Sequence, residues 1–212
     1  RFDPAYATAK KMINEGKIGE AYLVRCYSLD PNHAIEGFIE FSRNSPSGGI
    51  FMDLSIHDYD LSRWLLDSEP LKVWSIGGNF KYPEIADFDD VEVATSMVQF
   101  ENDKIGMFLS SRSCIHGYHV ETEIIGTEGI LRIGKEPIKN DITILNENGV
   151  VEECFEGFVE RFEIAYLEEL KYFVNCITED ITPSINAQDG IESIRLAEKA
   201  KLSLVKDTLQ II

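Results

Sequence analysis

Residues 50–66 place three polar side chains at a spacing that could support proton transfer. On a helix, residues four apart differ by about 40° in direction and residues seven apart by about 20°, so Asp53, His57 and Asp60 share one face. Asp58 points elsewhere. An imidazole with an ordinary pKa of about 6.5 can take a proton from an alcohol near neutral pH, and a neighbouring carboxylate can orient the ring and stabilise its cation. Asp53 and His57 are therefore a candidate acid/base pair.

Other interpretations of these residues remain open. An Asp and a His four residues apart on a helix are often a surface ion pair, or a core histidine that is satisfied by its neighbours. Asp53, His57 and Asp60 could also bind a divalent metal ion, but the sequence offers no obvious further ligand. His116 and His119 are three apart on a predicted strand, which would point them to opposite faces. We therefore expect no metal here.

The helix that would carry the pair has an apolar stripe, and its core positions are Ile50, Leu54, Leu61 and Leu65. His57 lies at the edge of this stripe, and Asp53 lies slightly farther round the helix. Groups at a core boundary are partly desolvated, so neighbouring charges shift their pKa values strongly. The predicted helix therefore places both groups where their protonation can be tuned.

Helices are predicted at both ends of the chain, with strands between them. The predicted helices are residues 4–15, 50–66, 160–178 and 187–207. The predicted strands are residues 21–29, 72–81, 91–101, 104–115 and 119–125, and shorter strands at 130–133, 142–146 and 150–155 are expected to extend the same sheet. Residues 30–49 are predicted to form a long loop, and loops of this length within compact domains are usually functional.

This order of elements predicts an α+β domain, with helices on one face of a largely antiparallel sheet. Within residues 91–101, apolar side chains alternate onto both faces of the predicted strand. The predicted helices suffice to cover only one face, so the other face is available for oligomerisation. We therefore expect a homo-oligomer, a dimer or tetramer, that assembles through the sheet.

The composition excludes several other classes of protein. The chain has 212 residues, of which 44% are hydrophobic and 27% charged, as expected for one globular domain with a substantial core. A net charge of -17 repels phosphate backbones and anionic lipid, so neither nucleic acid nor a membrane is an expected partner. The four cysteines form no CxxC pair, which favours reduced thiols in a cytoplasmic protein.

The chain resembles a known family in the segment that carries the pair. Residues 48–60 have the sequence GGIFMDLSIHDYD, and LSRWLL follows at 61–66. This segment closely resembles the catalytic helix of the Gfo/Idh/MocA oxidoreductases, most of all the inositol 2-dehydrogenases. Residues 1–4, 27–31 and 123–129 also resemble family segments, as does the closing stretch from residue 161 to residue 198, so the resemblance spans nearly the whole chain.

The resemblance implies that residues 1–212 are the substrate-binding, catalytic C-terminal domain of a nicotinamide-dependent dehydrogenase. Such an enzyme would oxidise a secondary alcohol of a cyclitol or sugar to a ketone, with His57 as the acid/base and Asp53 as the catalytic carboxylate. The resemblance also implies substrate contacts by Asp30 and Tyr118. Each has a plainer interpretation, because Asp30 could cap the turn at Pro31 and Tyr118 could pack at the end of a strand.

Two elements of the family's active site are absent from this sequence. One is the lysine of a Glu-Lys-Pro motif, and the other is the GxGxxG fingerprint of the Rossmann domain. We therefore expect NAD or NADP to be bound mainly by a Rossmann domain that this chain lacks, and the chain alone to be inactive. The alternative is a non-catalytic sugar-sensing or oligomerisation module of the same fold.

Overall fold

The computed structural model of the chain describes residues 1–45 and 47–212. At its centre is a seven-stranded sheet with the order β6-β5-β1-β4-β3-β2-β9. Its strands are β1 (Ala21–Pro31), β2 (Pro70–Gly78), β3 (Val93–Phe100), β4 (Ile105–Cys114), β5 (His119–Gly126), β6 (Ile130–Ile133) and β9 (Gln210–Ile211). β1 and β4 are parallel, and the other paired neighbours are antiparallel. The predicted α+β class is confirmed.

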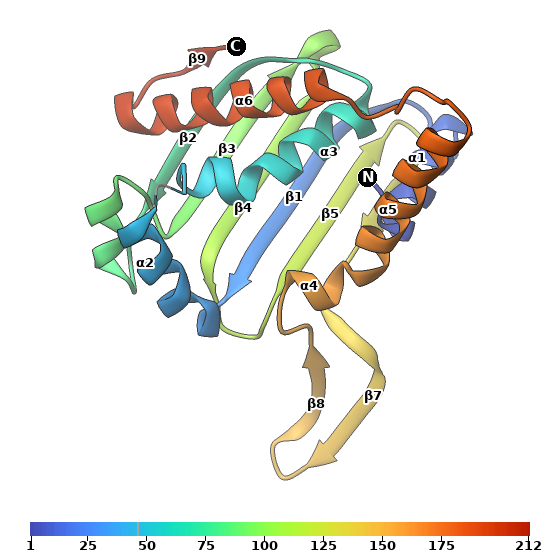
Figure 1. Cartoon of the computed structure of the whole chain (residues 1–212). Coiled ribbons are helices and arrows are strands. Elements are labelled where there is room, and N and C mark those ends of the chain that lie inside the picture. The colour runs from blue at the N-terminus through green and yellow to red at the C-terminus, as the bar shows by residue number, and fades with distance from the viewer. Residues whose placement is uncertain (46) are drawn as a thin grey trace.

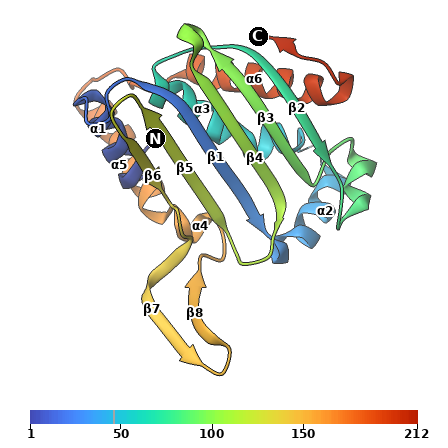
Figure 2. The same ribbon diagram turned by 180° about the vertical axis from the view of Figure 1, so that it is seen from behind.

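Helices lie on one face of this sheet (Figure 1). They are α1 (Pro4–Asn14), α2 (Ile35–Asn44), α3 (Ile56–Leu66), α4 (Phe158–Arg161), α5 (Glu163–Thr178) and α6 (Ala187–Lys206), with a π-helical turn at Phe51–Ser55 and 3-10 turns at Asn32–Ala34, Pro83–Phe88 and Glu101–Asp103. Seen from behind, the opposite face of the sheet is uncovered (Figure 2). Within the described ranges, no helix combines the length and the apolar character needed to cross a membrane.

The main core fills the space between the sheet and helices α3 and α6. Its fully buried side chains include Val24, Leu65, Leu66, Phe100 and Leu196, each at most 1% exposed. Full burial of such a side chain stabilises the fold by about 2 kcal/mol relative to leaving it in water. These contacts hold α3 firmly against the strands, and α3 carries His57.

The prediction of a loop at residues 30–49 is wrong. Strand β1 continues to Pro31, and α2 occupies much of the remainder. The helix forms because Ile35 and Ile39, one turn apart, are buried together with Ile85 in a second, smaller core. Prolines and asparagines flank this short helix and are typical of loops, so the helical spacing of its apolar residues was not recognised in the sequence. Pro46, within the same predicted loop, lies outside the described residues.

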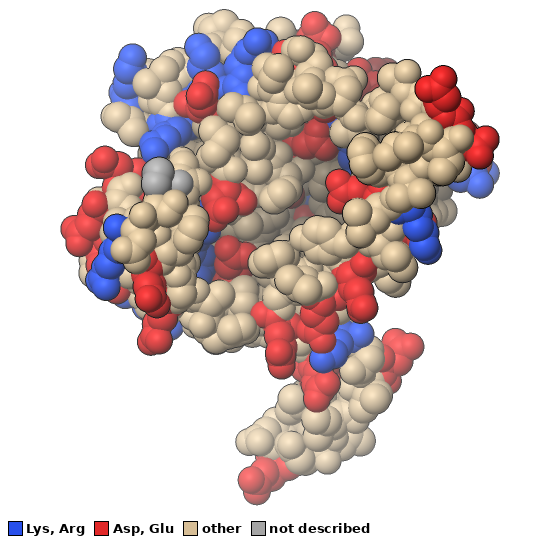
Figure 3. All heavy atoms as spheres, viewed as in Figure 1, with Lys and Arg blue, Asp and Glu red and all other residues tan. Residues whose placement is uncertain are grey.

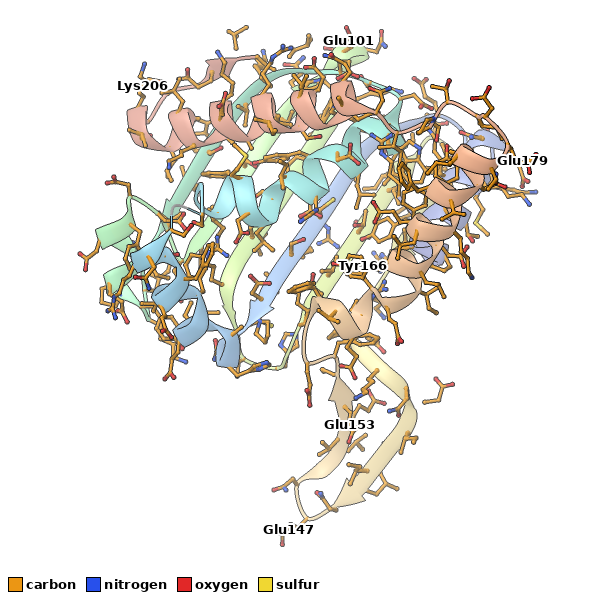
Figure 4. The ribbon with its side chains drawn as sticks, viewed as in Figure 1. Glu101, Glu147, Glu153, Tyr166, Glu179 and Lys206 are labelled. Atoms are coloured by element: carbon orange, nitrogen blue, oxygen red, sulfur yellow. The ribbon has the colours of Figure 1, made fainter. Side chains whose placement is uncertain are left out.

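The strands predicted at residues 142–146 and 150–155 exist, but they do not extend the sheet. Instead β7 (Ile138–Asn146) and β8 (Gly149–Cys154) form a separate two-stranded hairpin that projects from the body of the molecule (Figure 1). Glu147 lies at its far tip and Glu153 lies along β8 (Figure 4). The predicted helix at 160–178 is interrupted at Phe162, which separates α4 from α5.

Among the large apolar side chains that are exposed, two groups each lie on one element or surface of the molecule. The uncovered sheet face presents Trp74, Ile76, Met97, Ile105 and Met107, which are 37–50% exposed. Helix α5 presents Ile164, Leu167, Leu170, Phe173 and Ile177, which are 51–66% exposed. The expectation that the helices cover only one face of the sheet is confirmed.

Candidate active site

Two glycines and an aspartate set the start of the helix that carries the candidate pair. Gly48 and Gly49 have φ values of +84° and +86°, a conformation that other residues rarely adopt. A Cβ on Gly48 would lie 2.8 Å from a side-chain carbon of Met52. The first helical amide, that of Ile50, donates a 2.8 Å hydrogen bond to Asp90 Oδ1. The Asp90 carboxylate thus occupies this helix N-terminus, where backbone amides favour negative charge.

Three polar contacts fix the rotation of the helix on the sheet. Ser55 and Ser110 of β4 are 2.7 Å apart, and the hydroxyls of Tyr59 and Ser96 of β3 are 2.9 Å apart. Asp58 accepts a 2.7 Å hydrogen bond from Ser28 of β1. Because each contact joins the helix to a different strand, the helix cannot turn without breaking buried hydrogen bonds.

Asp53 lies in the π-helical turn and His57 lies one turn later, at the start of α3. The π-helix is rare and occurs mostly as single turns, frequently at functional sites. Both side chains remain accessible to solvent. Desolvation by the surrounding protein lowers the pKa of His57, and the charges of Asp53 and Asp60 act against it by raising that pKa. His57 is therefore held largely neutral near pH 7, the form that can accept a proton.

Asp30 lies between two further residues of the site because of the strand register. In the sheet, Leu29 pairs with Ser111 of β4 on one side and with His119 of β5 on the other. The next residue, Asp30, therefore falls between Arg112 and Tyr118. Desolvation raises the pKa of Asp30 to about 6; the cation of Arg112 lowers it, and the Asp53 charge raises it.

Tyr118 is 6% exposed and packs edge-on against Phe162, with the ring centroids 6.3 Å apart. Burial raises the pKa of its phenol, and the Asp30 charge contributes in the same direction. Tyr118 therefore stays protonated and can donate a hydrogen bond. The structure brings Asp30 and Tyr118 together, and Arg112 links Asp30 to Asp53.

Arg112 is the residue of this site that the sequence analysis missed. Its Nη1 donates a 2.8 Å hydrogen bond to Asp53 Oδ2 and lies 3.6 Å from Asp30 Oδ2. A signal for it exists in the sequence. Phe108 and Ser110 precede it at alternate positions of β4 and are buried on the helix-bearing side, so a lone arginine at the next such position should have indicated a buried ionic partner.

Asp60 is committed to another ionic cluster. Its carboxylate accepts hydrogen bonds of 2.6 and 2.8 Å from the guanidinium of Arg1, which also contacts Asp189 at 3.0 Å. This pairing leaves Asp60 poorly suited to serve as a metal ligand beside Asp53 and His57. In the part of the chain that the structure describes, no group of three or more acidic, His or Cys side chains is arranged to hold a metal ion.

The prediction that His116 and His119 point to opposite faces is wrong. Strand β4 ends at Cys114, so His116 lies in the turn before β5 rather than in a strand. The turn brings His116 Nε2 within 3.1 Å of His119 Nδ1. Strand alternation does not apply across such a turn, which is the physical reason for the error.

The helix-bearing face is hollowed between α3 and α5, with acidic side chains around the hollow (Figure 3). Tyr166 extends from α5 beside this region (Figure 4). The site therefore combines a neutral imidazole, carboxylates and a protonated phenol. Such a set can bind a ligand rich in hydroxyl groups, because carboxylates accept and a phenol donates hydrogen bonds. His57 can accept a proton from one of those hydroxyls.

A family model, curated relatives and solved structures all relate this chain to the same family. Residues 6–132 match the family model of the GFO/IDH/MocA C-terminal domain. The chain is 35% identical to scyllo-inositol 2-dehydrogenase (NAD(+)) of Bacillus subtilis over 90% of its own length, and it spans 54% of that protein.

Solved structures agree with this likeness. Scyllo-inositol dehydrogenase from Lactobacillus casei, with bound NAD(H) and scyllo-inositol, has a TM-score of 0.96 and 39% identity. Myo-inositol 2-dehydrogenase from Lactobacillus plantarum has a TM-score of 0.97 and 33% identity. Both matches cover 100% of this chain and 62% of the other chain.

Proposed function

This chain belongs to the GFO/IDH/MocA family, and we propose that it is the substrate-side domain of a dehydrogenase that oxidises a secondary alcohol of a cyclitol to a ketone. The observation that carries the proposal is the anchored pair of Asp53 and His57, joined through Arg112 to Asp30 and with Tyr118 beside it. In this proposal His57 accepts the hydroxyl proton, and Asp53 orients its ring and stabilises the imidazolium. Asp30 and Tyr118 bind neighbouring hydroxyls.

In the part of the chain that the structure describes, the glycine pair before the catalytic helix does not fit the phosphate-binding turn of a Rossmann domain. In a Rossmann domain the pyrophosphate of the dinucleotide binds at a free helix N-terminus after a glycine-rich turn. The turn at Gly48 and Gly49 instead leads to an amide already bound by the Asp90 carboxylate, which would repel phosphate. We therefore assign NAD to a separate Rossmann domain, in line with the cofactor named for the relatives from B. subtilis and L. casei. The nicotinamide, when bound, supplies the hydride acceptor.

The exposed apolar surface of α5 supports a second domain in the intact protein. Leu170, Phe173 and Ile177 are each more than half exposed, and contiguous apolar surface of this kind marks an interaction site. The chain also spans only about half to three fifths of the length of the relatives it matches.

The uncovered sheet face, with Trp74 and Met97 exposed, is in our proposal the contact between copies of the protein in a homo-oligomer.

A substrate screen tests the proposed function. The longer protein that contains this chain would be mixed with NAD or NADP and a panel of cyclitols and sugars, and the formation of reduced nicotinamide would be followed. We expect turnover with at least one inositol and a preference for NAD. Binding of inositols without turnover, measured by calorimetry, would instead support the sugar-sensing module.

A further inference from the structure

We propose that Arg112 is a positioning residue of this site, which holds the Asp53 carboxylate in the orientation that serves His57. The proposal rests on the proposed function for its catalytic consequences. Its geometric part, the control of Asp53 and through it of His57, concerns this chain alone.

The contacts of Arg112 are concentrated on the acidic groups of the site. Its side chain is 2% exposed, and its Nη1 is 2.8 Å from Asp53 Oδ2 and 3.6 Å from Asp30 Oδ2. Its Nε lies 3.7 Å from Asp90 Oδ2. One guanidinium is therefore shared by three carboxylates, from the π-helical turn, from β1 and from the segment before β3.

Phe38 of α2 fixes the plane of this guanidinium. The Cζ atom of Arg112 lies 3.7 Å from the centre of the Phe38 ring, the distance of a stacked cation-π contact. Because the five N–H groups of a guanidinium point in fixed directions, fixing its plane also fixes the direction of the bond to Asp53. Helix α2 thereby supports the site without carrying a candidate catalytic group.

The unused donors of Arg112 argue against a purely structural role. Among the residues that the structure describes, Nε and Nη2 of Arg112 and Oδ2 of Asp90 are buried without a hydrogen-bonding partner. Burial of a charged group whose donors are unpaired is unfavourable, and a structural arginine is normally satisfied by its neighbours. The guanidinium hydrogen bond that is formed within the described residues goes to Asp53. The charge of Arg112 is thus paired with carboxylates, but its one guanidinium hydrogen bond among the described residues is made to the carboxylate beside His57.

The Arg112 cation also compensates part of the negative charge of the carboxylates near His57. The charged groups that act on His57 are Asp53 and Asp60 of its own helix and the amino group of Arg1. Without Arg112, the Asp53 and Asp30 carboxylates lose their shared counter-ion, so negative charge near His57 is less compensated. Replacement of Arg112 by a neutral residue should therefore raise the pKa of His57.

The first experiment uses this chain and needs no enzymatic activity. NMR titration would follow the His57 ring, one of four histidines, in the wild type and in Arg112→Gln and Arg112→Lys. We expect Arg112→Gln to move the His57 midpoint upward by about 0.5 to 1 on the pH scale, and Arg112→Lys, which keeps the charge, to lie near the wild type. Arg63→Lys is the matched control, because Arg63 is also buried but pairs with Glu69.

The second experiment measures turnover in the longer protein through a double-mutant cycle with Asp53→Asn. We expect Arg112→Gln to lower kcat about 10- to 100-fold, with a small effect once Asp53→Asn is already present. Additive effects, or an unmoved His57 midpoint in a folded Arg112→Gln chain, would overturn the proposal. If the wild type oxidises no cyclitol, the proposed function fails while the titration still decides the role of Arg112.

Discussion

Asp58 Oδ2 accepts a 2.7 Å hydrogen bond from Ser28 Oγ, a contact that joins α3 to β1 beneath the site. The Asp58 carboxyl is 1% exposed. Burial raises its pKa from 3.8 to about 7, and the hydrogen bond from Ser28 opposes that rise. The helix that carries His57 is thus held by a carboxyl group that is neutral in mildly acidic solution and becomes charged near pH 7.

We predict that Asp58 makes the fold less stable as the pH rises. Its folded-state pKa lies above its unfolded value, so its contribution is fully favourable below pH 4 and is lost as the pH rises through 7, by on the order of 1.4 kcal/mol per pH unit between the two pKa values. Asp58→Asn, which cannot ionise, should raise Tm at pH 8 by several degrees and flatten the pH dependence of Tm.

Thermal denaturation at pH 5 and pH 8 checks this prediction. Asp141→Asn is the matched control, since Asp141 is exposed on the projecting hairpin. The control should change Tm little at either pH. A loss of stability in Asp58→Asn at pH 8 would show that the charged form of Asp58 is the one the fold requires.

The second prediction concerns Asp30, whose pKa of about 6 places its charge change within the working pH range. Its ionised form accepts hydrogen bonds from substrate hydroxyls, so in the longer protein KM for a cyclitol should rise about 10-fold as the pH falls from 7 to 5. In Asp30→Asn, KM should be higher at pH 7 and nearly independent of pH. Asp87→Asn, at an exposed position, is the control, and an equal pH dependence of KM in Asp30→Asn and wild type would refute the role.

The third prediction distinguishes the electrostatic effect of Asp53 on His57 from its role in orienting the His57 ring. The Asp53 carboxylate raises the pKa of His57, so Asp53→Asn should shift the acidic limb of the kcat/KM profile to lower pH. It should also lower kcat about 100-fold, because the amide orients the ring poorly and cannot stabilise its cation. A lower kcat with an unshifted profile would mean that Asp53 acts only through geometry.

The fourth prediction tests the uncovered sheet face. Met97 is 50% exposed at the centre of β3, and Met97→Lys places a charge within the proposed contact between copies. Light scattering should show a mass reduced toward that of one protomer. Val205→Lys, on α6 and 72% exposed, should leave the mass unchanged. A wild-type protein that is monomeric at high concentration would count against the interface.

Local signals were enough to predict much of the fold. Asp3 and Pro4 are a local signal for the start of the first helix, and the Asp3 carboxylate accepts hydrogen bonds from the amides of Ala5 and Tyr6. The main strands were predicted to within about three residues because their alternation is set by one buried face. Helix α2 was missed because its burial depends on Ile85, nearly fifty residues away, which no local window contains.

The residues of the candidate site that share one helix could be predicted from their spacing. The contacts that depend on the pairing and packing of distant elements could not. Asp53 and His57 lie on one short stretch of chain, so their spacing alone indicated a pair. Arg112 reaches Asp53 because the π-helical turn packs on β4, and it reaches Asp30 because β1 and β4 pair in parallel. The π-helical turn also gave no local signal. Pairings between distant strands are set by the whole fold, so a single sequence does not show them.

In the proposed reaction His57 accepts the proton of the substrate hydroxyl. The most direct measurement is kcat of the longer protein with its best inositol substrate and NAD, for the wild type and for His57→Ala, with Tm confirming that both are folded. We expect His57→Ala to decrease kcat by a factor on the order of 10² to 10⁴. Equal kcat values for the two proteins would contradict it.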